Sequence, residues 1–373
     1  MPAKHKTLEM IMGELEALQF DDKAIEDYKN SFEHIITTES PETIHKLIDE
    51  NPDSHFVLVP LLAGSLFMLH RFQDIYNLIS PLDLSGADRH LDYFNGKLIK
   101  YYYQALKYLG KPVDPLYSLL VRNREYGNSY SVSVLVNCIL DFQINNHIYQ
   151  EIKEHILDNH ERSRYCFYNG IINLVKGNYK TALEFFDESD ILNREPELDS
   201  VLKKYIIVTK LLLSNYSIFY PYSKELIPYF SLIGAIKRAE VDVFYKLLEE
   251  HKDEYFKMNL YFIIKRLIQN LIQEGLRKIT VCYSRILVKD INEILGINVD
   301  YLIHKTIKEG TIKGYVADGV FYSMSLEKSD PIFGNSIKKA VETRNVMMKM
   351  MKYPEIVPLC YEKIFDGDAK KDL

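Results

Sequence analysis

Residues 277–324 read RKITVCYSRILVKDINEILGINVDYLIHKTIKEGTIKGYVADGVFYSM, and this stretch decides the fold of the C-terminal part of the chain. Within it, residues 288–295 and 299–309 carry apolar side chains at the three- and four-residue spacing of a helix. Gly296 and Gly310 follow these two segments, in the position where a helix commonly ends in a left-handed residue. The stretch therefore predicts two short helices joined by a tight turn.

A strand and a hairpin are expected on either side of these helices. Residues 278–283 (KITVCY) are rich in β-branched and aromatic residues, which favours a strand. Residues 312–317 and 320–324 flank Asp318-Gly319, a dipeptide that favours a two-residue hairpin turn because both of its positions need positive φ. The order strand, helix, helix, hairpin predicts a winged helix at residues 277–323.

The chain before the winged helix is predicted to be helical. Apolar residues recur at three- and four-residue spacings from the N-terminus to about residue 275. Glycine and proline are sparse, and residues such as Pro60, Gly110, Gly127 and Gly177 fall where helices of roughly 10–18 residues are expected to end. This pattern favours a mostly α fold over an α/β fold.

One segment indicates how these helices pair. Residues 165–186 read YCFYNGIINLVKGNYKTALEFF, and Gly170, Gly177, Ala182 and Phe186 match the spacing of a tetratricopeptide repeat. Small residues let the two helices of a repeat approach closely, while the aromatic residue fills the groove between neighbouring repeats. Because one such repeat cannot bury its own apolar face, others must flank it. We therefore expect a tetratricopeptide-like helical-repeat solenoid.

The same signals divide the chain into three parts. Residues 1–222 are expected to form the helical repeats. Residues 223–323 form the second part, whose helical section at 223–276 leads into the winged helix. Residues 324–373 are expected to hold a helix at 331–352 and a polar tail.

The composition excludes several classes of protein. The 373 residues carry a net charge of −6, whereas a dedicated DNA-coating protein is usually basic. The four cysteines stand far apart, without the clustering that a disulfide framework or a zinc site requires. The first residues lack the apolar segment of a signal peptide, and the longest apolar run, at 56–69, is too short and too mixed to span a bilayer. We expect a protein of the cytoplasm, the nucleus or both.

The sequence contains no recognisable catalytic, cofactor-binding or metal-binding motif. It has no GxxxxGK loop, no GxGxxG loop and no GxSxG elbow, and it has no HxH, HExxH or CxxC pattern. A single histidine such as His304 is more often a surface or capping residue than a metal ligand. The sequence therefore predicts a protein that is not an enzyme and has no cofactor or metal.

Nucleic-acid binding is the main alternative to protein binding for the predicted winged helix, because the second helix of such a domain often reads DNA. Here that helix offers His304, Lys305 and Lys308, opposed by Asp300 and Glu309. Across the whole predicted winged helix, seven Lys or Arg stand against five Asp or Glu. This balance is weak beside the clustered cations that phosphate contacts require, so protein contact is favoured.

The predicted hairpin is a candidate protein-binding edge. A two-stranded ribbon leaves main-chain groups unpaired at an edge, and such an edge can accept a strand from a neighbouring protein. Gly314, Tyr315 and Val316 on the first strand, or Val320 and Phe321 on the second, could supply it. The alternative is an edge that lies in solvent.

The predicted C-terminal helix carries a second candidate surface. Ile337, Val341, Met347, Met348 and Met351 lie on one face at helical spacing. Methionine is flexible and polarizable, which suits an adaptable contact surface. A partner-binding stripe and an ordinary core stripe remain equally open.

Helical repeats that run directly into a winged helix resemble the PCI module, a family named for the proteasome lid, the COP9 signalosome and initiation factor 3. The residues that carry the resemblance are 226–251 (LIPYFSLIGAIKRAEVDVFYKLLEEH) and 262–296 (FIIKRLIQNLIQEGLRKITVCYSRILVKDINEILG). The YSRI sequence at 283–286 opens the winged helix as in the family. Residues 197–354 are similar to one subunit of the 26S proteasome lid in particular, while residues 1–160 carry much weaker resemblance.

The resemblance has consequences for single residues. It implies that Tyr283 and Ile286 lie in the core and that Arg285 bridges the strand to the preceding helices. The family usually has a serine after YSRI that caps the next helix, but this chain has Leu287. We therefore expect the start of that helix to lack its side-chain cap.

For function, the resemblance implies a structural scaffold. Lid subunits of this family pair through their winged helices, their C-terminal helices gather in one bundle, and a small acidic tether protein is held among them. By this resemblance the wing would contact another PCI lid subunit and the methionine stripe would enter the bundle. The alternatives are a PCI subunit of an mRNA-export complex with nucleic-acid contact, or of a signalosome or initiation-factor complex.

Overall fold

The computed structural model describes residues 28, 31–32, 34–50, 55–86, 89–193, 195–218, 220–221, 223–324 and 331–350, with backbone alone at 55, 197, 331–336 and 348–350. The helices and strands of these residues are, in chain order, α3 (Pro41–Glu50), α4 (His55–Met68), α5 (Phe72–Ile79), the 3-10 helix η2 (Arg89–Leu91), α6 (Asp92–Leu109), α7 (Asp114–Tyr126), α8 (Ser129–Asn145), α9 (Asn159–Lys176), α10 (Tyr179–Leu192), α11 (Pro196–Leu212), the 3-10 helix η3 (Lys224–Leu226), α12 (Ile227–Arg238), α13 (Val241–Glu250), α14 (Lys252–Lys257), α15 (Tyr261–Arg266), α16 (Ile268–Cys282), β1 (Arg285–Leu287), α17 (Val288–Leu295), α18 (Asp300–Lys308), β2 (Gly314–Ala317), β3 (Val320–Ser323) and α19 (Pro331–Met350).

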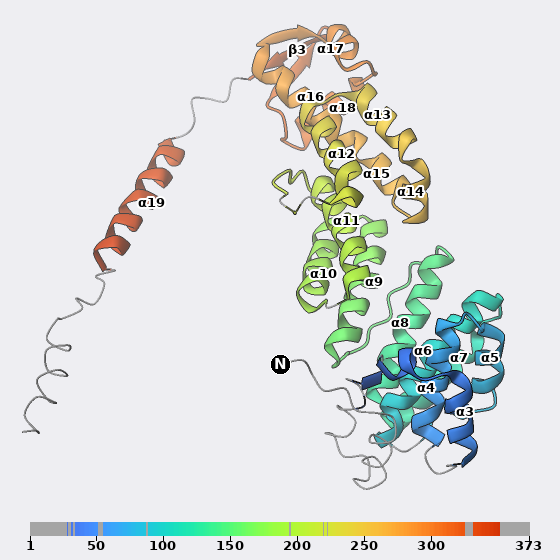
Figure 1. Cartoon of the computed structure of the whole chain (residues 1–373). Coiled ribbons are helices and arrows are strands. Elements are labelled where there is room, and N and C mark those ends of the chain that lie inside the picture. Colours follow the sequence, from blue (N-terminus) through green and yellow to red (C-terminus); the bar gives the residue numbers. More distant parts are fainter. Residues whose placement is uncertain are drawn as a thin grey trace, which may run out of the picture. The chain divides into compact units, whose positions relative to one another are not determined.

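These elements form two compact units. The first contains the described residues up to Gly234 together with Val243–Asn270, and the second contains Ala235–Asp242 and the described residues from Leu271 onward. The first unit is all helix, and the only described sheet belongs to the second (Figure 1). The predicted mostly α fold, with helical repeats followed by a winged helix, is confirmed.

The hairpin α9–α10 shows why the repeats form where the sequence places them. Gly177 joins the two helices with φ +92°, a backbone conformation that glycine adopts without strain. A Cβ atom at Gly170 would overlap the ring of Phe186, which is fully buried between the rings of Phe167 and Tyr205. α10 packs along α9 on one side and along α11 on the other, as Figure 1 shows. The predicted repeat is therefore confirmed in its packing.

Helix α4 differs from the expectation, because it runs through Pro60 instead of ending there. Val57, Leu58, Val59 and Leu61 around this proline are all buried. Their burial outweighs the loss of one main-chain hydrogen bond that a proline inside a helix causes.

The winged helix has a three-stranded antiparallel sheet with the strand order β1-β3-β2. Asp318 and Gly319 connect β2 and β3, with φ of 50° and 74°. Gly296 ends α17 with φ 67°, and the Asn298 side chain accepts a hydrogen bond from the Asp300 N–H at 3.0 Å where α18 begins. The predicted helix end at Gly296 and the predicted turn at Asp318-Gly319 are confirmed. The core of this domain is formed by Ile286, Ile291, Leu295, Val299, Ile303 and Phe321.

The predicted strand at 278–283 is wrong. These residues continue α16 to Cys282, and β1 begins only at Arg285. The buried side chains of α16, from Leu271 to Ile279, follow helical spacing, so burial on one face outweighs the β preference of the residues. Val281 and Tyr283 consequently lie exposed at the end of the helix.

Candidate protein-binding surfaces

The wing presents a single candidate edge. β3 pairs with β1 on one side and with β2 on the other, so Val320 and Phe321 have no free edge and this part of the expectation is corrected. Phe321 is 2% exposed and belongs to the core. Among the strands of the described residues, β2 carries the predicted edge with Gly314, Tyr315 and Val316.

The geometry of the hairpin fixes which groups of β2 face outward. A two-residue turn makes Ala317 and Val320 a hydrogen-bonded pair, and pairs alternate along an antiparallel ladder. Val316, opposite Phe321, is therefore in a non-hydrogen-bonded pair, and its N–H and C=O point away from β3. These main-chain groups are available to a strand added at this edge.

The side chains of β2 keep this edge close to β3. The exposed ring of Tyr315 stacks on that of Tyr322 opposite, with centroids 5.0 Å apart and planes at 14°. A Cβ atom at Gly314 would overlap the ring of Phe321 and the carbonyl oxygen of Tyr322, so only glycine fits there. The edge strand is thus closely packed against β3.

A second surface on the winged helix was not expected from the sequence. Tyr283, Leu287 and Ile294 are 46%, 49% and 55% exposed and line one hollow of about 490 Å³ beside β1. The expected core position of Tyr283 is therefore wrong, whereas Ile286 is buried as expected. Arg285 lines the same hollow and is exposed, with no hydrogen bond or ion pair to any residue that the structure describes, so its expected bridge is also wrong.

Leu287 combines two properties of this surface. It precedes α17 with extended backbone and without a side-chain cap, as expected from the missing serine. Its apolar side chain lies in the hollow instead. Exposed apolar residues that share one hollow are typical of a protein contact site.

Helix α18 does not have the character of a DNA-reading helix. The Lys305 ammonium lies 3.8 Å from the Glu309 carboxylate, one turn along the same helix. The outward face also carries Tyr301, which is 76% exposed, and His304, which is exposed. Paired charge and an exposed aromatic ring fit a protein contact better than a phosphate backbone.

The C-terminal helix α19 carries the predicted stripe only in part within the described side chains. Ile337, Val341 and Met347 are 58%, 46% and 58% exposed. The side chain of Met348 and the whole of Met351 lie outside the described residues. The described part of the stripe is therefore apolar and exposed, and its role in contact remains a prediction.

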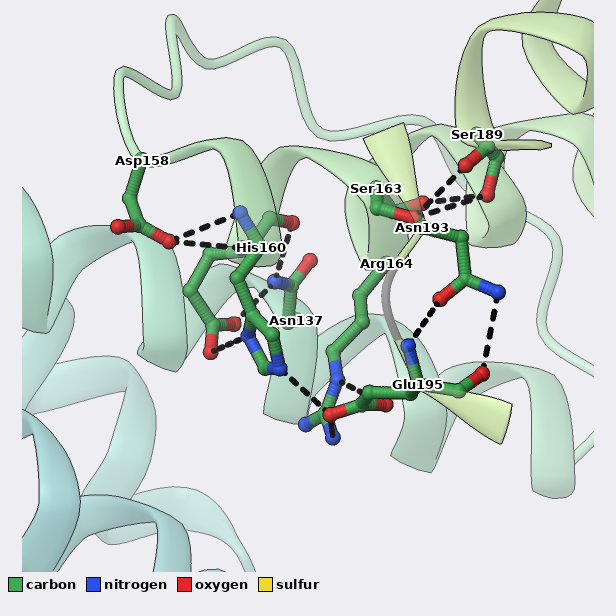
Figure 2. A network of polar contacts seen from close by, with 9 residues as sticks. Asn137, Asp158, His160, Ser163, Arg164, Ser189, Asn193 and Glu195 are labelled. Atoms are coloured by element: carbon green, nitrogen blue, oxygen red, sulfur yellow. Dashed lines mark hydrogen bonds and ion pairs between the residues drawn. The ribbon is translucent and has the colours of Figure 1, made fainter. Parts of the chain in front are cut away.

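A polar network inside the repeats is the other feature that the sequence did not reveal (Figure 2). Asn137 of α8 donates to the Glu161 carboxylate of α9 at 2.7 Å and to its carbonyl oxygen at 2.9 Å. His160 lies between two carboxylates, with Nε2 at 2.5 Å from Glu195 and Nδ1 at 3.4 Å from Glu161. Arg164 donates to Glu195 at 2.6 Å. The network ties α8, α9 and the start of α11 together.

The pKa values of the ionisable groups in this network differ strongly from their ordinary values. Hydrogen bonds to Glu161 and Glu195 raise the pKa of His160 to about 9, so the ring is protonated at neutral pH. Burial alone would raise the pKa of the Glu161 carboxyl, but the hydrogen bond from His160 and the charge of Arg164 outweigh it and hold that pKa at about 2. Glu195, under the same opposing effects, also has a pKa of about 2. All three groups are therefore ionised together over a wide pH range.

The one sequence signal for this network is the spacing of Asp158 and Glu161 at the start of α9. Asp158 caps the helix by accepting hydrogen bonds from the N–H groups of His160 and Glu161, each at 3.0 Å. An acidic residue three positions after a capping residue is typical of a helix start. That signal predicts the cap, but not that Glu161 turns inward.

The described residues contain no group of His, Cys, Asp and Glu side chains that could hold a metal ion. In the same part of the chain, each helix is too short or too polar to cross a membrane.

Comparison with known proteins identifies the class to which this fold belongs. The PCI domain family matches residues 248–320, which contain most of the winged helix. The 26S proteasome regulatory subunit RPN3 of Encephalitozoon cuniculi is 43% identical over 92% of this chain and 93% of its own length. The probable RPN3 of Schizosaccharomyces pombe is 26% identical over 81% of this chain and 68% of its own length.

The chain therefore belongs to the RPN3 family of PCI-domain proteins, the family of 26S proteasome non-ATPase regulatory subunit 3. The Caenorhabditis elegans protein of that name is 27% identical over 55% of this chain, which spans 46% of the relative's length. The resemblance of residues 197–354 to one particular lid subunit is thereby confirmed.

Proposed function

We propose that this chain is a structural scaffold subunit of the lid of the 26S proteasome regulatory particle, where it supports lid assembly and ubiquitin-dependent protein degradation without enzymatic activity of its own. The observation that carries the proposal is the 43% identity to RPN3 of E. cuniculi over 92% of the chain. The PCI match at residues 248–320 supports it. As a lid subunit it acts in the cytoplasm and the nucleus.

A pull-down of the tagged full chain followed by mass spectrometry tests this function. Other lid subunits and the rest of the regulatory particle are the expected partners. Recovery of mRNA-export factors, signalosome subunits or initiation-factor subunits in their place would contradict the proposal. The proposed domain division at residues 1–222, 223–323 and 324–373 is tested by which truncations retain those partners.

The wing is proposed to contact a neighbouring PCI lid subunit through the edge of β2. The outward-facing N–H and C=O of Val316 support this. Val316→Pro removes the outward donor while the ladder to β3 stays intact, because an edge strand tolerates proline there. We expect it to weaken co-purification of the neighbouring subunit. Val316→Thr keeps the N–H and the β-branched shape, and it should leave the contact unchanged.

The C-terminal helix is proposed to enter a helix bundle with the other lid subunits. The exposed apolar side chains of Val341 and Met347 support this. Val341→Asp should block lid assembly while the isolated chain stays folded. Val346→Asp is a matched control, since Val346 is equally exposed but lies five residues on, about 140° around the helix. Equal assembly by both variants would refute the bundle contact.

A small acidic tether protein of the lid is a further proposed partner. No residue of the chain is assigned to that contact. Its presence among the proteins recovered in the pull-down is the expected result.

A further inference from the structure

A pocket of about 320 Å³ lies within the first unit, between α6, α8, α9 and α11. Its wall is half polar and half apolar. The polar part includes Lys100, Lys107, Asp141, Arg164 and Glu195, and it reaches the network drawn in Figure 2. A volume of this size is typical of a site for a small ligand or for one residue of a polypeptide.

Each carboxylate in this wall already has a cationic partner. Asp141 accepts from Lys107 at 2.8 Å and from the hydroxyl of Tyr103. Glu195 accepts from Arg164 at 2.6 Å.

Glu161, also in the wall, is paired with the protonated His160. The three carboxylates are therefore matched by three cations.

Lys100 is the cation that remains. Its ammonium group makes no hydrogen bond and no ion pair with any residue that the structure describes, although it lines the same pocket as three matched carboxylates. Burial lowers its pKa, and the repulsion of Arg164 adds to this effect, against the attraction of Glu161 and Glu195. This half-buried ammonium therefore directs its donors to water or to an anion that enters the pocket.

The charge balance restricts the chemistry of that anion. With His160 protonated, the pocket wall and His160 together hold four cations against three carboxylates, which leaves one unmatched positive charge. A single carboxylate neutralises that charge, whereas a phosphate dianion would leave a buried negative charge. A carboxylate is therefore the group that fits beside Lys100.

The apolar half of the wall restricts the ligand further. Val134, Phe167, Leu198 and Val201 line the pocket together with Lys100. A ligand that fills both halves carries a carboxylate and an apolar group a few bonds apart. The last residue of a polypeptide has this arrangement, because its α-carboxylate and its side chain leave the same carbon atom.

We propose that this pocket binds the C-terminal residue of a partner polypeptide, with the α-carboxylate on the Lys100 ammonium and an apolar side chain against Leu198 and Val201. The inference rests on the proposed scaffold function, since the ligand is part of another polypeptide. It adds a peptide-binding site in the repeats to the surfaces of the winged helix and α19.

The probe is a fluorescein-labelled pentapeptide, Gly-Ser-Gly-Ser-Leu, titrated with the full chain and followed by fluorescence anisotropy. The peptide with a free C-terminus should bind about tenfold or more tightly than the same peptide with an amidated C-terminus, because the amide lacks the charge that pairs with the ammonium. Equal binding of the two peptides, or no binding of either, would overturn the proposal. Displacement by acetate or phosphate as readily as by unlabelled peptide would also overturn it, by showing an unspecific anion site.

Three variants test the residues. Lys100→Met should weaken binding about tenfold or more and should not lower the melting temperature, because it removes an unmatched cation. Leu198→Trp should weaken binding by filling the apolar half. Lys180→Met, an exposed lysine of α10, is the control and should change neither quantity. Unchanged binding by Lys100→Met would overturn the proposal, because Lys100 would then not contact the ligand. A melting temperature clearly below that of the control would also overturn it, because Lys100 would then be matched within the protein.

The failure of this inference can be told apart from failure of the proposed function. If the unmodified chain co-purifies with lid subunits but the free peptide does not bind, only the pocket is refuted. If the chain recovers no lid subunit, the scaffold function fails whatever the peptide does.

Discussion

Replacing Glu161 by alanine is expected to destabilise the first unit by about 2–4 kcal/mol. The side chain is 2% exposed and accepts a 2.7 Å hydrogen bond from Asn137. A buried hydrogen bond to a charged group contributes about 1.5–3 kcal/mol, and the longer contact with the half-exposed His160 adds less than about 1 kcal/mol. Asn137 keeps its second bond, to the Glu161 carbonyl oxygen, which limits the loss.

Hydrogen exchange of the amides in α8 and α9 is the appropriate assay, because the two units of the chain need not unfold together. The expected loss corresponds to exchange faster by roughly 30- to 1,000-fold at amides that open with this unit. Glu151→Ala is the matched control. This change breaks the 2.8 Å ion pair between Glu151 and Lys176. Because both side chains are more than a third exposed, we expect a loss of stability of less than about 1 kcal/mol.

The pH dependence gives an independent check. The pKa of His160 is raised from 6.5 to about 9, so its contribution is complete below about pH 6.5 and is lost as the pH rises through about 9. The pKa of Glu161 is lowered from 4.5 to about 2, so its contribution is complete above about pH 4.5 and is lost as the pH falls through about 2. The difference in free energy of unfolding between the unmodified chain and Glu161→Ala should therefore be largest between about pH 4.5 and 6.5.

Two results would refute this reasoning. One is a protection loss in Glu161→Ala no larger than that in Glu151→Ala. The other is a difference between the unmodified chain and Glu161→Ala that stays constant from about pH 6 to about pH 10, since His160 loses its proton over that range.

Three further outcomes are expected. Phe186→Ala should lower the stability of the first unit by about 3–5 kcal/mol, because the fully buried ring fills the space that Gly170 leaves. Faster hydrogen exchange in α9 and α10 would show this loss. A loss below about 1 kcal/mol would mean that the repeat is not packed around this ring. Gly319→Ala should lower the stability of the winged helix by about 1–2 kcal/mol through backbone strain alone, since φ is +74° and no atom lies within 4 Å of the added carbon. Thermal unfolding measures this loss, and an unchanged transition temperature would contradict the prediction. In the folded chain the exposed thiol of Cys282 should react with a disulfide reagent. The thiol of Cys138 is buried, and burial raises its pKa, so it should react only on unfolding. Peptide mass spectrometry distinguishes the two cysteines, and equal labelling would contradict the packing of α8.

The winged helix was predictable because its signals are local. Gly296 and Gly310 end helices with φ of 67° and 73°, and Asp318-Gly319 turns the hairpin with two positive φ values. Each of these conformations depends on the residue itself and its immediate neighbours. Sequence reasoning was therefore sufficient for the helix ends and the turn.

The segment 278–283 shows where local reasoning fails. Its β-branched residues favour a strand in isolation, but Ile279 lies one turn beyond the buried Gly275 and Leu276 on a helix already formed. Whether a β-branched residue enters a strand depends on what it packs against, and that is a property of the folded chain. Tyr283, for which the family resemblance implied a core position, lies exposed just beyond the end of this helix.

The candidate surfaces were predictable only in part for a similar reason. The edge at Val316 follows from the hairpin, but the central position of β3 depends on pairing with β1, which lies more than 30 residues earlier. The hollow around Leu287 requires the same pairing. The unmatched charge of Lys100 becomes visible only when α6, α8, α9 and α11 are brought together.

The polar network of Figure 2 also has a consequence for the order of events during synthesis. Asn137 and Glu195 are 58 residues apart, which a ribosome translating about 5–20 residues per second needs roughly 3–12 s to cover. Glu161, the direct partner of Asn137, is made 24 residues after it, and Glu195 follows 34 residues later. Until Glu161 is made, the amide of Asn137 on α8 lacks its acceptor, while the completed helices before α8 can already pack. The network is therefore completed in two steps during synthesis: water is the hydrogen-bond partner of Asn137 until Glu161 replaces it, and Glu195 closes the network last.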